Sequence, residues 1–263
     1  MPFVCLNCYQ TPWVKKRKRQ LKQQQQHKKQ DSSAAKGSLV VAGSITLNAL
    51  HNSMGNPCRL GPYSNRESIL LVGEGNFTFA KSLCIALGGA KIVATSLDSR
   101  SVVLEKYDEA ARTALQTIRG ANGKVFHDMD ATLPDSLLIC KGSVQRFDKV
   151  VFNFPHVGGS TNEAVLLNQN VLSGFMKALA EAKVVSKSTK SQLHITLRST
   201  LFYDSWEVEK LGEENGFDFV KKIPFEASQF HDMGYTEART TPAFRDSPSA
   251  ENAFTYVFSP IFD

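Results

Sequence analysis

The feature that most constrains the fold is one stretch, residues 68–80, with the sequence SILLVGEGNFTFA. Its four consecutive apolar residues, Ile69–Val72, are typical of a parallel strand buried on both faces. Gly73 and Gly75 then indicate a tight turn, and apolar residues recur at helical spacing as far as Leu87. A strand, a glycine loop and a helix in this order open a Rossmann-like sheet, where the loop lets a nucleoside-sized ligand approach the backbone. A plain structural turn is the alternative.

Strand and helix patterns alternate beyond this stretch, as a doubly wound, mostly parallel sheet requires. The expected fold is therefore α/β, with an antiparallel strand near the C-terminus. Further strands are expected at Lys91–Leu97, Lys124–His127, Lys149–Phe152, Leu193–Leu197, Phe217–Ile223 and Phe254–Phe258. Helices are expected over 102–118, with Ser99 or Ser101 as N-cap, and over Pro134–Cys140, 164–179 and Tyr203–Asn215.

Charge is distributed unevenly along the chain. Residues 1–30 carry eight Lys and Arg, five of them in a row at 15–19, and no acid, so of the formal net charge of +6 the other residues carry −2. Such a block is typical of a disordered arm that binds nucleic acid or of a nuclear-import signal, and a non-specific solvated tail is the alternative. We expect a basic arm (1–30), a linker (31–67) and a folded domain (68–260).

Several classes of protein are disfavoured by the sequence. No apolar run approaches the roughly 20 residues that span a bilayer, and the N-terminus lacks the basic-then-apolar order of a secretory signal. Five cysteines without framework spacing indicate reduced thiols in an intracellular compartment. Cys5 and Cys8 form one Cys-x-x-Cys without the second pair that a structural zinc needs, so no metal is expected.

The glycine loop departs from the dinucleotide-binding fingerprint. The third glycine of Gly-x-Gly-x-x-Gly is replaced by Thr78, which argues against NAD and favours a nucleoside ligand without phosphates, of which S-adenosylmethionine is the obvious one. Asp98 follows the second strand, where an acid can accept hydrogen bonds from ribose hydroxyls, and a helix N-cap is its other interpretation. Asp130 follows the third strand and can accept from the adenine amine; Asp128 is a rival, and either can be a turn residue.

The second informative segment is Asn153-Phe154-Pro155-His156, which follows the fourth strand beside the switch point of the sheet. Asn153 can hydrogen-bond a base edge, and Phe154 can stack on a base, worth about 1–3 kcal/mol. Pro155 fixes the turn, and His156 can act as a general base or orient the base. A buried turn with a satisfied histidine is the alternative.

Four segments carry a family likeness: GEGNFTF (73–79), ATSLDS (94–99), Asp130-Ala131 and FDKVVFNFPH (147–156). Together with HITL (194–197), YDSW (203–206), Gly234-Tyr235 and Arg239, they resemble the Rossmann-like domain of the eukaryotic 25S rRNA uridine-N3 methyltransferases. The likeness covers about residues 66–260, and GPYSN (61–65) is most similar to plant members.

This resemblance implies a class I S-adenosylmethionine-dependent methyltransferase fold and rRNA uridine-N3 methylation. RNA, as large-subunit rRNA or pre-ribosome, would be the partner, in the nucleus or nucleolus or else in the cytoplasm. Uracil N3 carries an imide proton, so His156 would be its base or would orient the ring, with Asn153 reading the uracil edge. By position, Asn153 to His156 would face the target base, and the methyl donor would contact Gly73, Glu74, Gly75, Asn76, Phe77, Asp98 (ribose) and Asp130 (adenine).

The sequence departs from the family pattern on the expected substrate side. The segment after His156 is shorter than in plant members, residues 197–200 (LRST) replace a lysine-and-glycine version, and residues 230–233 (FHDM) stand where Tyr-Pro is common. Two other functions therefore stay open. One is a non-catalytic S-adenosylmethionine-binding or interaction module, and the other is a methyltransferase for a different substrate.

Overall fold

The computed structural model describes residues 57–142, 146–238 and 249–261. All of them belong to one structural unit, which spans Gly43–Asp263. The expectations for the basic arm, for Cys5 and Cys8, and for Arg239 lie outside the described residues.

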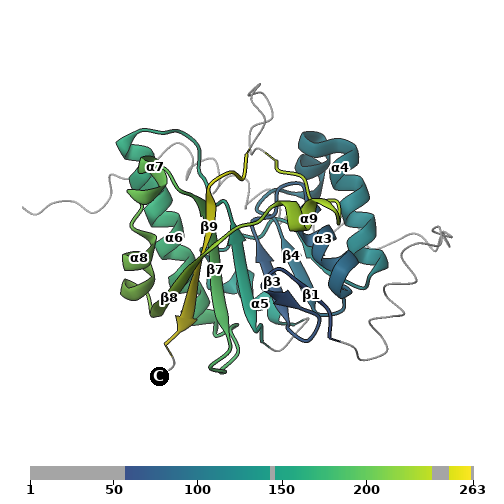
Figure 1. The fold of residues 1–263 in the computed structure, drawn as a ribbon, viewed down its shortest axis with the longest axis horizontal. Coiled ribbons are helices and arrows are strands. Elements are labelled where there is room, and N and C mark those ends of the chain that lie inside the picture. Colours follow the sequence, from purple (N-terminus) through teal and green to yellow (C-terminus); the bar gives the residue numbers. More distant parts are fainter. Residues whose placement is uncertain (1–56, 143–145, 239–248, 262–263) are drawn as a thin grey trace, which may run out of the picture. The chain divides into compact units, whose positions relative to one another are not determined.

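A seven-stranded sheet forms the centre of this unit, in the order β5-β4-β3-β6-β7-β9-β8 (Figure 1). The five strands from β5 to β7 are parallel, and β9 is antiparallel to both of its neighbours. The doubly wound sheet and the antiparallel C-terminal strand are thus confirmed. The strands are β3 (Ile69–Val72), β4 (Ile92–Thr95), β5 (Lys124–Phe126), β6 (Lys149–Asn153), β7 (Gln192–Arg198), β8 (Phe217–Pro224) and β9 (Ala253–Pro260).

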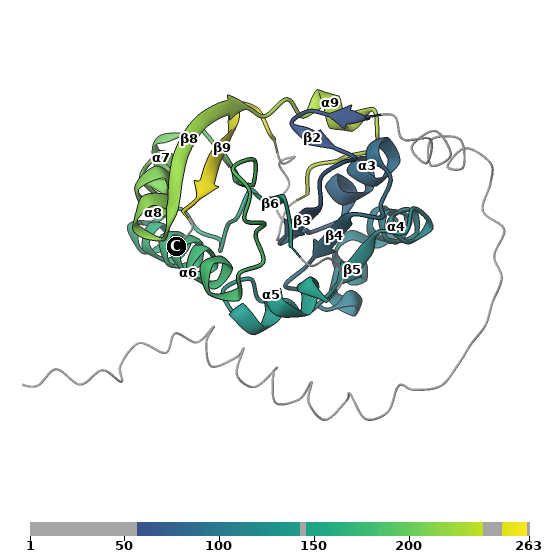
Figure 2. The same ribbon diagram turned by 90° about the horizontal axis from the view of Figure 1, so that it is seen from below.

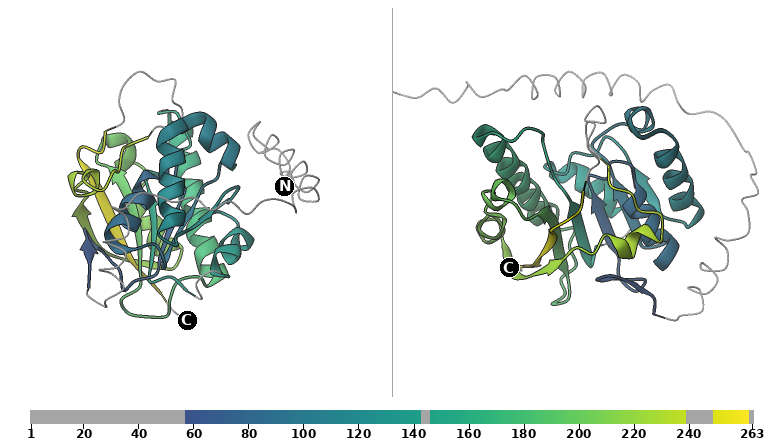
Figure 3. Two further views of the ribbon diagram at one scale, coloured as in Figure 1. Left: turned by 90° about the vertical axis from the view of Figure 1, so that its right-hand side faces the viewer. Right: turned by 45° about the horizontal axis from the view of Figure 1, so that its top comes forward.

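Helices cover both faces of the sheet. One face packs against α3 (Thr78–Leu87), α4 (Arg100–Gly120) and α9 (Ser228–His231), and the other against α5 (Pro134–Lys141), α6 (Asn162–Ala182) and α8 (Val208–Glu214). Figure 2 shows the helices on the two faces of the sheet. The right-hand view of Figure 3 shows the blue helices and the green helices on opposite sides of the sheet. No helix within the described ranges is long and apolar enough to cross a membrane.

The side-chain alternation of a strand explains why β3 is a continuous apolar run. Successive residues point to opposite faces, so Ile69 and Leu71 join the cluster under α3 and α4, while Leu70 and Val72 join the cluster under α6. All four are at most 4% exposed. The central strand of this sheet therefore has no solvated face and needs apolar residues at every position.

The folded unit begins before Ser68, within the segment that we assigned to the linker. Strands β1 (Arg59–Leu60) and β2 (Tyr63–Ser64) form a small antiparallel hairpin. Tyr63 is 1% exposed, and its ring lies 5.9 Å from the ring of Phe79 in α3. Two-residue strands are too short to show a periodicity, so the sequence pattern could not reveal them.

The sequence predicts one continuous helix over Tyr203–Asn215, and this prediction is wrong. The structure has a short α7 (Leu201–Asp204) and a separate α8, with Glu207 between them in the left-handed region at φ 49°. Trp206, at the break, is fully buried. Burial of this indole requires a turn of the backbone that an apolar periodicity does not encode. Helix α4 is kinked at Asp108, whose φ of 39° and ψ of −119° are not helical.

Candidate active site

The loops that follow four parallel strands meet at one edge of the sheet. These carboxyl ends lie toward the top of Figure 1, since the arrow of the antiparallel β9 points down. Glu74 N donates to Thr95 O at 2.8 Å, which joins the loop after β3 to the end of β4. Likewise, Met129 N donates to Ser96 O at 2.9 Å and Phe154 N to Thr196 O at 2.8 Å. The predicted site residues of all four loops are therefore brought to the same edge.

The two glycines of the first loop pack closely against neighbouring side chains. Gly73 has φ 69°, and a Cβ there would lie 2.5 Å from the Phe152 ring. A Cβ on Gly75 would lie 3.0 Å from the Tyr107 hydroxyl. Burial, and secondly the charge of Asp98, raises the pKa of Tyr107 to about 12. Tyr107 thus reaches from α4 to the edge, a role that its place in an apolar helical pattern did not indicate.

Glu74 turns its carboxyl group into the protein. The side chain is 9% exposed, and Oε2 accepts from Ala80 N of α3 at 3.2 Å. Burial raises the pKa of this carboxyl to about 7, against the opposing effect of the Ala80 hydrogen bond. The carboxyl group of Glu74 therefore binds the first turn of α3.

We expect Glu74→Gln to change how stability depends on pH. The folded pKa of about 7 lies above the unfolded value of 4.5, so the folded state binds the extra proton and stability falls as pH rises from about 4.5 to 7. The fall is on the order of 3 kcal/mol at pH 8. The variant should lose this slope and be more stable than wild type at pH 8 in urea unfolding. The exposed Glu213→Gln is the matched control, and a parallel slope in both variants would contradict the assignment.

Asn76 and Phe77 are both buried and contact other parts of the protein. Asn76 Oδ1 accepts from Thr78 N at 3.0 Å, and Asn76 Nδ2 donates to Thr236 O at 3.0 Å, which fastens the segment after Tyr235 to the glycine loop. Phe77 has φ 61° and is fully buried, with its ring 5.3 Å from that of His127. The link to Thr236 spans 160 residues of sequence, and no local pattern signals it.

Asp98 is a partly exposed carboxylate at the edge and is not a helix cap. The N-cap of α4 is Ser99, whose Oγ accepts from Val102 N at 3.3 Å, so the cap interpretation of Asp98 is wrong. Asp98 Oδ2 lies 2.6 Å from Lys106 Nζ, and its side chain is 31% exposed. A ligand hydroxyl can therefore reach the carboxylate, which shares its charge with Lys106.

Asp128 and Asp130 both lie in the loop after β5. Asp130 Oδ1 accepts from Thr132 N at 3.0 Å and from Thr132 Oγ1 at 2.7 Å, which is the geometry of a turn. Asp128 is exposed, with φ 60°. The turn interpretation of Asp130 is thus correct for Oδ1.

Asn153 is the last residue of β6 and is tied to two further strands. Its Oδ1 accepts from Thr196 Oγ1 of β7 at 2.7 Å, and Thr196 Oγ1 lies 2.9 Å from Thr255 Oγ1 of β9. Both threonines are at most 3% exposed, whereas Asn153 is partly exposed. The buried hydroxyl groups of Thr196 and Thr255 thus orient the Asn153 side chain, and no sequence pattern indicates this role.

The next two residues set the direction of the chain. Phe154 has φ 50°, and its half-buried ring meets that of Phe225 edge-on with the centroids 5.5 Å apart. Pro155 is buried. Asn153 and His156 lie on either side of the left-handed turn at Phe154. Their polar side chains therefore contact different parts of the protein.

His156 lies against an aromatic cluster formed with Phe202, Tyr203 and Trp206, whose ring centroids are 5.9–6.0 Å from its own. Its Nδ1 accepts from Gly158 N at 2.7 Å. Burial lowers the pKa of His156, so the ring is neutral near pH 7. A neutral imidazole whose Nδ1 accepts carries its hydrogen on Nε2.

Arg198 at the end of β7 is a further polar residue of this edge. Its Nε is buried and has no hydrogen-bond partner within the described part of the chain. A buried donor without a partner is costly, on the order of 1–3 kcal/mol. Sequence analysis noted Arg198 only as a departure from the family pattern.

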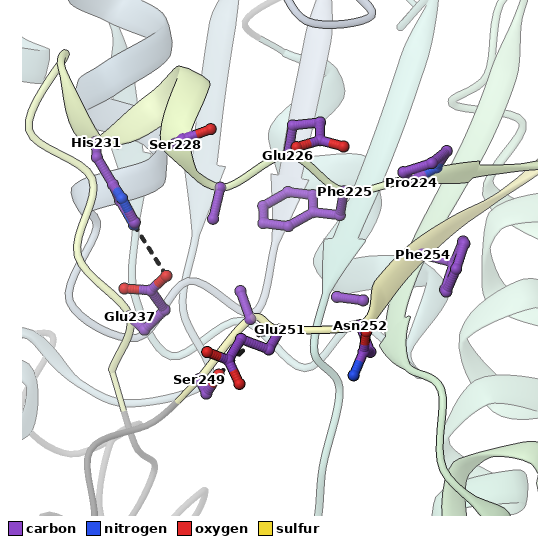
Figure 4. Close-up of a pocket in the computed structure, with 13 residues that line it drawn as sticks. Pro224, Phe225, Glu226, Ser228, His231, Glu237, Ser249, Glu251, Asn252 and Phe254 are labelled. Carbon is purple, nitrogen blue, oxygen red and sulfur yellow. Dashed lines mark hydrogen bonds and ion pairs between the residues drawn. The ribbon is translucent and has the colours of Figure 1, made fainter.

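Phe225 also borders a cavity of about 500 Å³ between the chain that follows β8 and the chain that precedes β9 (Figure 4). Three carboxylates line it, those of Glu226, Glu237 and Glu251, and Glu237 binds His231 at 2.9 Å. None of the predicted site residues lines this cavity. Its acidic lining disfavours RNA phosphates, so we place the site at the strand ends instead.

The acceptors at the edge fit a nucleoside that carries no phosphates. Ribose hydroxyls and an adenine amine are hydrogen-bond donors, and the loops after β4 and β5 present carboxylates, which would repel a pyrophosphate. No group of His, Cys, Asp and Glu able to hold a metal ion occurs among the described residues. This sheet order, with a glycine loop and acidic loops at the switch point, defines a class I S-adenosylmethionine-dependent methyltransferase.

Comparison with known proteins identifies the family to which the chain belongs. It belongs to the BMT5-like family, described as rRNA (uridine-N3-)-methyltransferases, whose profile matches residues 70–239. An uncharacterized Arabidopsis thaliana protein is 33% identical over 75% of this chain and 94% of its own. The Saccharomyces cerevisiae 25S rRNA (uridine(2634)-N(3))-methyltransferase is 23% identical over 78% of this chain and 76% of its own.

Two other similarities are more partial. The Arabidopsis thaliana heavy metal-associated isoprenylated plant protein 41 is 31% identical over 71% of this chain, which spans only 35% of that protein. The crystal structure of TrmN from Thermus thermophilus is 15% identical, with a TM-score of 0.42 over 73% of this chain and 43% of that one. The family assignment rests on the profile and on the first two relatives.

Proposed function

We propose that this protein transfers the methyl group of S-adenosylmethionine to N3 of a uridine in large-subunit rRNA. The observation that carries the proposal is the meeting of two groups of residues at one sheet edge. Acidic loops suited to the donor follow β4 and β5, and the Asn153–His156 segment begins at the last residue of β6, on the other side of β3. Family membership supports the same reaction, and the relative from yeast is named for uridine-N3 methylation of 25S rRNA.

The chain's own residues would bind and orient the two reactants. Asp98 would accept from the ribose hydroxyls, Asp130 would lie near the adenine, and the backbone of residues 73–77 would contact the remainder of the donor. When bound, S-adenosylmethionine supplies an electrophilic methyl group on sulfur. The uridine must leave any helix to expose N3, which costs a few kcal/mol, and stacking on the half-buried Phe154 offsets part of that cost.

The atoms of the reaction balance without a metal or an oxidant. The N3 proton of uridine passes to water, and N3 gains the methyl carbon while the sulfur keeps the electron pair of the broken bond. Proximity and orientation at the edge provide much of the acceleration. Asn153 and His156 are the polar side chains that we place against the base.

The proposal includes a role for the basic arm in RNA binding and a cellular location. Eight positive charges in residues 1–30 suit sequence-independent phosphate contacts, whose strength falls as salt rises. We place the protein in the nucleus or nucleolus, where large-subunit rRNA is assembled. Deletion of residues 1–30 should weaken RNA binding and flatten its salt dependence, whereas S-adenosylmethionine binding should be unchanged.

We expect Asp98→Asn to weaken S-adenosylmethionine binding about 10- to 100-fold, because hydrogen bonds to a charged group contribute about 1.5–3 kcal/mol. Calorimetric titration of the full-length protein measures the change. Asp108→Asn is the matched control, since it removes the same charge from an 85%-exposed side chain on α4. Equal affinity of the two variants would remove Asp98 from the donor site.

Nucleoside mass spectrometry of rRNA tests the function itself. Cells that lack the protein should lose one 3-methyluridine from large-subunit rRNA, and the wild-type gene should restore it. Unchanged 3-methyluridine would overturn the substrate assignment. Donor binding without methyl transfer to that rRNA would instead favour a non-catalytic binding module.

A further inference from the structure

Asn153 and His156 each have a hydrogen-bond acceptor atom, Oδ1 and Nδ1 respectively, that already accepts a hydrogen bond from within the protein. We infer that the site presents only donors to the target base, Asn153 Nδ2 and His156 Nε2, as uracil with its two carbonyls requires. Thr196, Thr255 and the Gly158 amide are the positioning groups that enforce this polarity. The inference rests on the proposed function and adds the means by which uracil is selected and activated.

The orientation of Asn153 follows from the threonine pair. The Thr196 hydroxyl has a single hydrogen and gives it to Asn153 Oδ1 at 2.7 Å. The hydrogen between the two threonines must then come from Thr255, whose Oγ1 lies 2.9 Å from that of Thr196. Thr255 thus donates to Thr196, and Thr196 donates to the amide oxygen of Asn153, which engages one lone pair of that oxygen. The NH₂ group of the amide remains to donate.

The orientation of His156 follows from the backbone. A peptide N–H can only donate, so the 2.7 Å contact from Gly158 N makes His156 Nδ1 an acceptor. The hydrogen of the neutral ring is then on Nε2. Protonation would place an N–H on Nδ1 against the N–H of Gly158. His156 is for this reason poorly suited to remove the N3 proton, and well suited to donate.

The chemistry of uracil matches a pair of donors. N3 lies between two carbonyl groups, and loss of its proton spreads the negative charge onto O2 and O4. Donors placed at the carbonyl oxygens stabilise that anion, the kind of interaction whose removal costs about 10²–10³ in rate in other enzymes. Cytosine has an amine in place of one carbonyl, so two donors would face each other and the base would be rejected.

The first experiment distinguishes a donor from a base at position 156. The substrate is rRNA from cells that lack the protein, methylated by the full-length protein with S-adenosylmethionine, and 3-methyluridine is measured by mass spectrometry. We expect His156→Gln, which keeps an N–H donor and cannot accept a proton, to retain activity within about tenfold of wild type. We expect His156→Ala to lose about 100-fold or more. Equal loss in both variants, or no loss in either, would overturn the inference.

The second experiment tests Thr196 as a positioning residue. Thr196→Val replaces the hydroxyl by a methyl group and should lower turnover about tenfold, while Thr196→Ser should restore it. In an Asn153→Ala background the valine substitution should have no further effect. A merely structural role of Thr196 would instead lower turnover by the same factor in both backgrounds. Calorimetric binding of S-adenosylmethionine reports whether each variant is folded.

The outcome for the wild-type protein separates the two proposals. If it forms no 3-methyluridine on this rRNA, the proposed function fails. If it forms 3-methyluridine while His156→Gln behaves like His156→Ala, or while Thr196→Val acts equally in both backgrounds, the function stands and the donor-only site is wrong.

Discussion

Asn153→Ala is expected to lower methyl transfer about 100- to 1,000-fold, the range found when one donor to a developing oxyanion is removed. The side chain is partly exposed at the carboxyl edge and is oriented by Thr196. Asn153→Asp, which is close in shape, should fall at least as far, because a carboxylate oxygen would replace the amide donor. Turnover is measured as 3-methyluridine formed by the full-length protein on rRNA from cells that lack it.

The controls for Asn153 separate chemistry from folding. S-adenosylmethionine affinity should stay within about twofold of wild type, since the asparagine lies outside the donor loops. Loss of the acceptor for the buried Thr196 hydroxyl should cost about 1–3 kcal/mol of stability, which urea unfolding measures. The exposed Asn170→Ala on α6 should change neither quantity. Turnover of the alanine variant within threefold of wild type would remove Asn153 from the reaction.

Gly73→Ala should destabilise the protein by about 2–4 kcal/mol, one of the largest effects on stability that we expect. Two costs combine at this position. A Cβ would stand 2.5 Å from the Phe152 ring, and the backbone has φ 69°. Overpacking costs about 1–3 kcal/mol, and the left-handed conformation costs a further 1 kcal/mol or so for alanine. Urea unfolding at constant pH measures the sum.

Gly216→Ala isolates the second of these costs. Gly216 has φ 85°, and a Cβ there would meet nothing within 4 Å. It should lose about 1 kcal/mol. Equal losses at Gly73 and Gly216 would show that Phe152 gives way and that only the backbone conformation matters. If the clash is real, replacing Phe152 by leucine in the Gly73→Ala protein should recover part of the stability lost on substitution of Gly73.

Much of the architecture was predictable because it depends on local patterns. Buried strands such as Ile69–Val72 are apolar at every position, and α6 repeats its apolar residues at helical spacing. Each pattern extends over enough residues to be distinguished from chance. The strand ends that carry Asp98, Asp130 and Asn153 followed directly, since parallel strands place their carboxyl ends at one edge.

What failed in the sequence analysis lacked such a pattern. The hairpin around Tyr63 consists of two-residue strands, and α9 has four residues. The break before α8 follows from the burial of Trp206, which depends on packing against the sheet. The sequence permits Asp98 to be a ribose ligand, a helix cap or both, and the hydrogen bond from Val102 N to Ser99 Oγ shows that Ser99 is the cap.

The sequence by itself determined the fold class, the glycine loop and the segment Asn153–His156 as the place to look for chemistry. Only the tertiary structure decided which atoms of that segment are free to act. The reason is physical: hydrogen-bond polarity is set by partners distant in sequence, such as Thr196 and Thr255 for Asn153. The side chain of Glu74 illustrates the same point, because its burial beside α3 places Oε2 in a hydrogen bond with Ala80 N that the sequence does not indicate.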